Sequence, residues 1–255
     1  MRTILLLLVA SLTTFAQKPV LQKDRQVLMD FRKDTELAPP NIPLATQRAV
    51  LSKVFRKYLT DENQCNSNFD AGDNSDPLAA ARKAGQIVPR ILDSVTGSFT
   101  GAGESQTAYV IFAGECNASH ADNFGTKRVA IFTGTRLIAD LDADFKRDIV
   151  RKTDLNSDGL DELLMTSGDM NQGTVVEMAA LVSFDGGRFR VLHDFGTVLE
   201  DECASGRPGS TSTASVLYIS DVFPGKMPNL TMENYQSSCR KTMRWRLIST
   251  GKRQD

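Results

Sequence analysis

The stretch Asp154-Leu155-Asn156-Ser157-Asp158-Gly159-Leu160-Asp161-Glu162, followed by Leu163-Leu164-Met165, decides how this chain is interpreted. Oxygen-bearing side chains stand at alternate positions, and the glycine permits the sharp backbone turn that lets them converge. Such a set suits Ca²⁺, which takes about six to eight oxygen ligands. The expected ligands are the side chains of Asp154, Asn156 and Asp158, the carbonyl of Leu160 and the carboxylate of Glu162, with Asp161 as a substitute.

The flanking residues exclude an EF-hand. An EF-hand loop ends on a glutamate at its twelfth position and lies between two amphipathic helices. Here the twelfth position is Met165, and Thr166-Ser167-Gly168 stops any helix. The apolar run Leu163-Leu164-Met165 is short and is followed by a turn signal, which predicts a buried strand. The 154–162 loop is therefore expected to connect two strands.

The pattern Asp-x-Asn-x-Asp-Gly-x-x-acid followed by an aliphatic residue resembles the calcium loop of FG-GAP or VCBS-type repeats of integrin-like β-propellers. It falls on Asp154, Asn156, Asp158, Gly159, Glu162 and Leu163, with Glu162 where the family more often has Asp. The resemblance is confined to this loop. It implies Ca²⁺ as the cofactor and propeller-blade-like units of strand, loop and strand.

A plain solvated turn is the alternative, because Asn, Ser, Asp and Gly are also ordinary turn residues. A plain turn does not explain why four carboxylates lie within nine residues, at Asp154, Asp158, Asp161 and Glu162. Such closely spaced carboxylates repel one another unless a cation offsets them. The metal site is the interpretation that accounts for all four.

A second, acid-poor copy of the loop lies earlier in the chain. The segment 98–106 aligns with 154–162 at an offset of 56 residues, so that Phe99 matches Leu155 and Gly103 matches Gly159. Ser98, Thr100 and Ala102 replace the acids and the asparagine. The β-rich part, 86–250, holds about three such units, whereas a closed propeller needs about four or more blades. An open or sandwiched sheet is therefore expected.

The N-terminus predicts export. Arg2, an apolar run from Ile4 to Ala10 and the cleavage signal Thr14-Phe15-Ala16 have the layout of a signal peptide over residues 1–16. No later segment is long enough to span a bilayer as a helix. The expected location of the mature chain is secreted or periplasmic.

Four cysteines, Cys65, Cys116, Cys203 and Cys239, agree with an oxidising compartment. Three pairings are possible in principle. Nearest-neighbour pairing, Cys65 with Cys116 and Cys203 with Cys239, keeps each bridge within one half of the chain. The spacing of Cys116 and His120 leaves a zinc site as an alternative, although no second close pair of ligands accompanies them.

Helical patterns precede strand patterns, which predicts an α+β fold: N-terminal helices followed by a mainly antiparallel β-sheet domain. Helices are expected at Lys23–Lys33, at Ala45–Leu59 and after Asp76. The expected division is 1–16 signal peptide, 17–43 helix and Pro-rich linker, and 44–255 a single α+β domain. Strands are expected near 87–92, 94–100, 107–113, 128–133, 136–141, 148–152, 161–165, 175–184, 189–195, 216–222, 229–235 and 242–248, with a loop over 200–213.

Composition and motifs favour a non-catalytic protein. With 30 basic and 31 acidic residues, the net charge indicates no nucleic-acid or membrane-surface partner. No nucleophile elbow, phosphate loop or HExxH motif is present, and His120 and His193 are the only imidazoles. The acids Asp140, Asp142, Asp144 and Asp148 lack a glycine and favour a solvated strand over a second cation site.

The leading hypothesis is a secreted, calcium-stabilised, non-catalytic binding or structural module with a macromolecule or glycan as partner. The alternative is a secreted metal-dependent hydrolase that uses acids of the 154–162 loop. The two differ in whether the ion keeps an open coordination position.

Overall fold

The computed structural model describes residues 25–33, 40–54, 90–112, 127–143, 148–240 and 242–252. Over these ranges the chain is mainly antiparallel β-sheet, as predicted, and carries one α-helix. The elements are β1 Gln26–Asp30, α1 Leu44–Val54, β2 Arg90–Gly97, β3 Gln106–Phe112, β4 Lys127–Thr133, β5 Arg136–Asp142, β6 Asp148–Thr153, β7 Glu162–Asn171, β8 Thr174–Ser183, η2 Asp185–Gly187, β9 Arg190–Asp201, η3 Cys203–Ser205, β10 Thr211–Ser220, β11 Asn229–Ser238 and β12 Arg246–Lys252.

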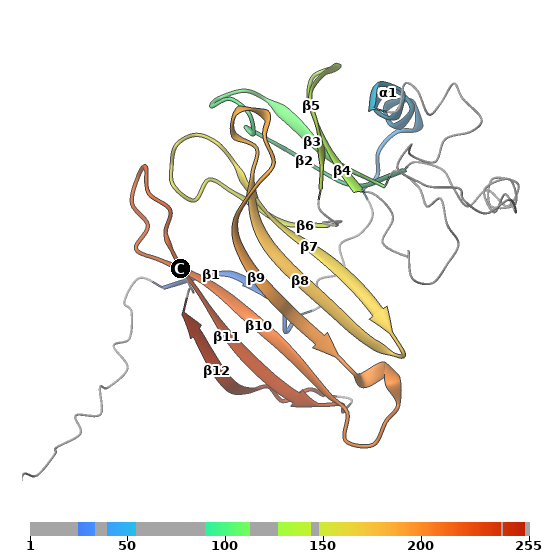
Figure 1. Ribbon diagram of the computed structural model, residues 1–255, viewed down its shortest axis with the longest axis vertical. Helices are drawn as coiled ribbons and strands as arrows, with labels where there is room; N and C mark the ends of the chain where they lie inside the picture. Colours follow the sequence, from blue (N-terminus) through green and yellow to red (C-terminus); the bar gives the residue numbers. More distant parts are fainter. Residues whose placement is uncertain are drawn as a thin grey trace, which may run out of the picture.

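The strands form two sheets. The larger runs in the order β12-β11-β10-β9-β8-β7-β6, and the smaller in the order β2-β3-β4-β5. The larger sheet divides at β10: residues 212–214 pair with β9, whereas 216–219 pair with the N-terminal strand β1. Figure 1 shows the smaller sheet and α1 at one end of the long axis and β10–β12 at the other.

The paired parts of β7 and β8, residues 163–167 and 179–182, are buried on both faces. Leu163, Met165 and Val182 pack with Phe99, in the turn after β2, and with residues of the smaller sheet. The alternate residues face the second core, which lies between β6–β9 and the β1, β10–β12 part of the larger sheet; it includes Leu164, Leu181, Leu28, Leu217 and Leu230. This double burial explains why Leu163-Leu164-Met165 is a continuous apolar run rather than an alternating one.

Helix α1 covers the outer face of the smaller sheet. Val50 is its buried residue, and it packs against Ile111, Ala130 and Phe132 of β3 and β4. Leu51 and Val54 lie with Val50 at helical spacing and pack against the same cluster, as the apolar stripe of a helix on a sheet does. Residues 55–59 of the predicted helix lie outside the described residues, as do the predicted short helix after Asp76 and the signal peptide.

The predicted helix over Lys23–Lys33 is wrong, because Gln26–Asp30 forms strand β1. Leu28 and Phe31 are buried, as the helical pattern required, but they are buried between the two parts of the larger sheet. The edge of β10 supplies hydrogen-bond partners for β1, and the Phe31 N–H donates to the Ser215 carbonyl at 2.9 Å. Pairing with a strand far along the chain has overridden a local helical pattern.

Several strands begin or end at other residues than the sequence predicted. A single strand, β2, replaces the two expected before residue 100, and residues 98–105 form the turn that follows it. The predicted loop over 200–213 contains the end of β9, the short helix η3 and the start of β10. Neither sheet closes into a barrel or propeller over the described residues. No helix in the same residues has the length and apolar character that crossing a membrane requires.

Candidate metal-binding loop

The 154–162 loop joins β6 to β7, and its side chains hold its backbone in a tight curl. Asp154 Oδ2 accepts the Gly159 N–H at 3.0 Å, and Asp158 Oδ1 accepts the Leu160 N–H at 2.8 Å. The Asp158 N–H donates to Asn156 Oδ1 at 3.0 Å. Gly159 has φ +84°, which only glycine adopts readily, so the sharp turn expected from the sequence is present.

Glu162 lies at the first position of β7 and is almost completely buried, with 3% of its surface exposed. Its Oε2 accepts the Leu155 N–H at 2.8 Å. Burial is the largest cause, and the nearby carboxylates of Asp158 and Asp154 a smaller one, of a pKa of the Glu162 carboxyl raised to about 7. This placement groups Glu162 with the two aspartates, and a cation between them would offset both effects.

The three carboxylates are not yet close enough to share an ion. Among the described residues, only Asp201, Cys203 and Cys239 bring three such ligand atoms within 4.8 Å of one another. Oxygens that ligate one Ca²⁺ lie about 2.3–2.6 Å from it, so two of them are separated by about 5 Å at most. Ion binding therefore requires Asp154, Asp158 and Glu162 to turn towards each other.

Asp161 is directed away from this group. Its Oδ2 accepts the Ser98 N–H at 2.8 Å, and both carboxylate oxygens lie 3.3 Å from Lys152 Nζ. Its backbone N–H donates to the Ser98 carbonyl at 2.6 Å. The structure thus gives this predicted substitute ligand a different role, which is to join the loop to the turn that follows β2.

The acid-poor copy over 98–106 has the same local architecture as the loop. Gln106 Oε1 accepts the Phe99 N–H at 2.9 Å, at the same seven-residue separation as Glu162 and Leu155. Gly103, the counterpart of Gly159, has φ +75°. Sequence reasoning aligned the two segments but overlooked Gln106, although its match with Glu162 at the same offset was available as a signal.

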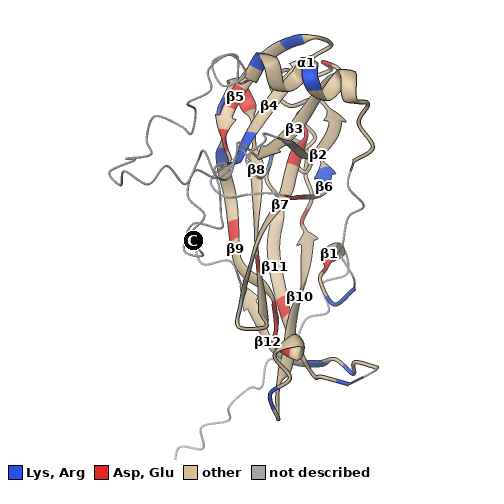
Figure 2. Ribbon diagram, turned by 90° about the vertical axis from the view of Figure 1, so that its right-hand side faces the viewer, with Lys and Arg blue, Asp and Glu red and all other residues tan. Residues whose placement is uncertain are grey.

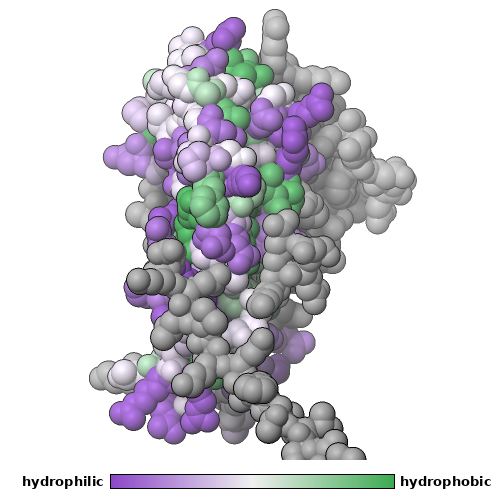
Figure 3. Space-filling view, turned by 90° about the vertical axis from the view of Figure 1, so that its left-hand side faces the viewer, coloured by the Kyte–Doolittle hydropathy of each residue, from purple (hydrophilic) through white to green (hydrophobic). Residues whose placement is uncertain are grey.

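The hairpin between β10 and β11 contacts the candidate loop. The Gly225 N–H donates to the Asn156 carbonyl at 2.5 Å. The tip is a turn closed by the Lys226 N–H and the Phe223 carbonyl at 3.1 Å, and it leaves Phe223 and its apolar neighbours Val222 and Met227 exposed. Figure 3, which views this side of the molecule, shows hydrophobic side chains among hydrophilic ones at mid-height.

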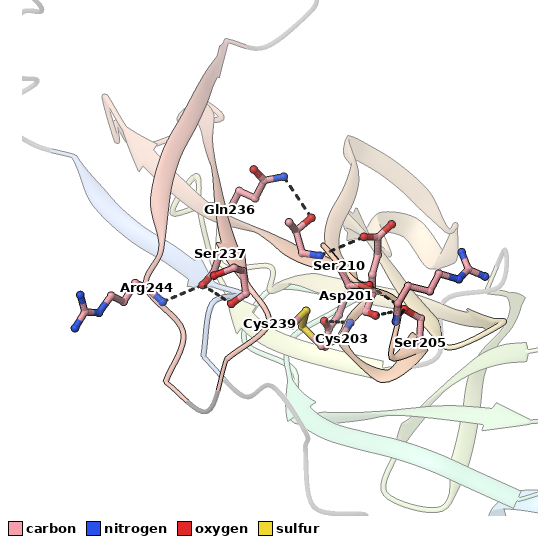
Figure 4. Close-up of a disulfide and its surroundings, with 12 residues drawn as sticks. Asp201, Cys203, Ser205, Ser210, Gln236, Ser237, Cys239 and Arg244 are labelled. Atoms are coloured by element: carbon pink, nitrogen blue, oxygen red, sulfur yellow. Dashed lines mark hydrogen bonds between the residues drawn. A yellow bond between two sulfur atoms is a disulfide. The ribbon is translucent and has the colours of Figure 1, made fainter.

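One of the predicted disulfides, Cys203–Cys239, is confirmed, with a Cα–Cα distance of 5.3 Å. It joins η3 to the residue that follows β11, and Asp201 Oδ1 accepts the Cys203 N–H at 2.9 Å (Figure 4). Because both sulfurs are bonded to each other, the Asp201 group is not a metal site. Cys65, Cys116 and His120 lie outside the described residues.

The remaining candidates have ordinary surroundings. The ring of His193, on β9, lies 4.5 Å from the ring of Phe195 in an edge-on contact. Asp140, on the edge strand β5, forms an ion pair with Arg128 at 2.6 Å. Asp144 of the same acidic group lies outside the described residues, so the preference for a solvated strand over a second cation site stays a prediction.

No protein-family model, no curated protein and no solved structure matches this chain. The interpretation of the site therefore rests on its own residues.

The metal-free protein is expected to lose stability as the pH rises from about 5 to 8. The folded-state pKa of Glu162 lies above the unfolded value, so its favourable contribution is complete below about 4.5 and is lost as the pH rises through about 7. Urea unfolding in chelator at several pH values measures this. In Glu162→Gln that part of the decline should disappear; an unchanged decline would place its origin elsewhere.

Proposed function

We propose that this chain is a secreted, non-catalytic binding or structural module stabilised by Ca²⁺ in the 154–162 loop. The observation that carries the proposal is the position of the loop. It leads from β6 into the buried start of β7, bonds to Ser98 in the turn after β2, and bonds to Gly225 in the β10–β11 hairpin. An ion that fixes this loop therefore fixes three segments that are far apart in the sequence.

The chemistry of the residues fits a structural ion. Asp154, Asp158 and Glu162 supply carboxylates, Asn156 an amide oxygen and Leu160 a carbonyl, and hard oxygens of this kind are what Ca²⁺ prefers. Asp161 is already paired with Lys152 and is left out of the proposed set. Because the acids must turn inward, part of the binding energy is consumed in that rearrangement, which favours weak binding.

The exposed hairpin tip is a surface that such an ion would hold in place. The Asn156 carbonyl accepts the Gly225 N–H, so ordering Asn156 also orders the tip. Val222, Phe223 and Met227 are exposed there within a span of six residues. Exposed apolar groups gathered in this way are typical of contact surfaces, and the partner class we propose is another macromolecule or a glycan.

A metal-dependent hydrolase is the second candidate, favoured by one observation. A carboxyl with a pKa of about 7 suits general acid–base catalysis near neutral pH, and Glu162 has one. However, this side chain is 3% exposed and already accepts the Leu155 N–H. A substrate could reach it only if the start of β7 opened, so the structural role is preferred.

Calcium is expected to raise the melting temperature of the mature protein. We expect a Kd of roughly 10⁻⁴ to 10⁻³ M, the extracellular end of the range for such loops. At ten times Kd the ion adds about 1.4 kcal/mol to the free energy of unfolding. Thermal unfolding in calcium and in chelator measures the shift, which Asp154→Ala or Asp158→Ala should abolish.

Asp185→Ala is the matched control, because Asp185 is an exposed acid in a turn. Its ion pair with Arg190, at 3.6 Å, is exposed as well. It should keep the full calcium shift. Equal melting temperatures with calcium and with chelator would reject the metal site. Hydrolysis of a screened substrate that disappears in Glu162→Gln while the calcium shift persists would favour the hydrolase instead.

A further inference from the structure

The end of the chain carries a segregated positive charge. Residues 240–254 contain six Lys or Arg residues and no Asp or Glu. The formal net charge of the whole chain is −1, so removing this +6 segment leaves −7 for the remainder. A nearly neutral protein thus has a strongly basic segment, and the described part of it, 240 and 242–252, forms the β11–β12 loop and strand β12.

The basic side chains that the structure describes here are free to contact a partner. Arg240, Arg244 and Arg246 are exposed, and none belongs to an ion pair within the described part of the chain. Figure 2 shows Lys and Arg in blue along the loop at the β12 end. Large apolar side chains are exposed near them in the sequence: Met243, Leu247 and Ile248 are 37%, 48% and 51% exposed.

The loop that presents these side chains is anchored at its base. Cys239 is held by the disulfide to Cys203, and the Arg244 N–H donates to Ser237 Oγ at 2.9 Å. Trp245 packs against the core of the larger sheet. In Figure 4 the Arg244 side chain points away from the disulfide, so the anchored backbone directs the charge outward.

We infer that the described residues of the β11–β12 loop and of strand β12, 239–240 and 242–251, form a docking surface for an anionic phospholipid membrane. Membrane-surface binding draws on attraction to anionic headgroups and on burial of apolar side chains at the interface, and this segment offers both. Exposed arginines would contact phosphates while Met243, Leu247 and Ile248 enter the boundary with the acyl chains. The inference goes beyond the proposed function: it adds a second contact surface, with a membrane as its partner, and it does not involve the calcium loop.

Other occupants fit the observations less well. A nucleic acid or anionic glycan would use the charges but leave the apolar side chains exposed. An added peptide strand needs a regular edge, whereas β12 has a register shift that leaves Ile248 without a partner on β11. A second copy paired antiparallel about Ser249 would place Arg246 opposite Lys252, and like charges directly opposite are unfavourable.

The test is co-sedimentation of the full mature protein with vesicles, in chelator so that calcium does not bridge protein and lipid. Phosphatidylcholine vesicles that contain phosphatidylglycerol should bind the protein, and phosphatidylcholine alone should not. Added salt should weaken binding. Arg244→Glu with Arg246→Glu should reduce partitioning about tenfold or more, and Leu247→Ser with Ile248→Ser should reduce it at low salt.

The matched control is Arg188→Glu with Arg190→Glu, which reverses two exposed arginines in the turn into β9 and should leave binding unchanged. Equal binding to both vesicle types, or an equal loss in the control, would overturn the inference. So would retention on heparin or polyglutamate without vesicle binding. The calcium-dependent melting shift is measured on the same variants, so that failure of membrane docking and failure of the metal site are distinguished.

Discussion

Gln106→Ala is expected to lower the free energy of unfolding by about 3–5 kcal/mol. Gln106 is 1% exposed, and its amide makes four hydrogen bonds: Oε1 accepts the N–H groups of Phe99 and Thr100, and Nε2 donates to Thr100 Oγ1 and Glu104 Oε2. The substitution leaves two backbone N–H groups without their acceptor and opens a cavity beneath the turn. Urea unfolding monitored by circular dichroism measures the loss.

Glu104→Ala is the matched control, because Glu104 is exposed and supplies only one of these acceptors. It should cost less than about 1 kcal/mol. A similar small cost for Gln106→Ala would show that water enters and satisfies the turn. In that case the hydrogen bond from the Phe99 N–H to the Gln106 side chain would contribute little to the stability of the 98–106 turn.

The local features of the fold could be predicted because they are short-range. The 154–162 loop curls as its glycine and its alternating polar residues indicated, and the strand that follows it is buried as its apolar run indicated. The second copy, 98–106, was visible from an offset in the sequence. In each case the residues that determine the geometry lie within about one turn or strand of each other.

The long-range features could not be predicted in the same way. Strand β1 has a helical pattern of apolar residues, and only the free edge of β10, far along the chain, makes it a strand. The contact between Gly225 and Asn156 depends on how the larger sheet divides, which no local pattern encodes. The same holds for Asp161, whose sequence position suggests a ligand but whose partners are Ser98 and Lys152.

Electrostatics gives a third case. The balanced totals of 30 basic and 31 acidic residues argued against an anionic surface as a partner. A total carries no information about where charges lie. The disulfide at Cys239 and the exposure of Met243, Leu247 and Ile248 are what turn a basic sequence into a presented surface.

Replacing both cysteines of the confirmed disulfide, Cys203→Ser with Cys239→Ser, is expected to lower the free energy of unfolding by about 4 kcal/mol. The bridge spans 36 residues, and in the chain-entropy model a loop of that length restricts the unfolded chain by about this amount. Urea unfolding measures the change, and alkylation with intact-mass measurement verifies that the parent protein has no free thiol at these positions. Ser210→Ala, which removes only a hydroxyl contact to Ser205 at 3.0 Å, is the nearby control and should cost about 1 kcal/mol or less. If the double variant were as stable as this control, η3 and the β11–β12 loop would be held by their hydrogen bonds alone, and Cys239 would not anchor the docking surface.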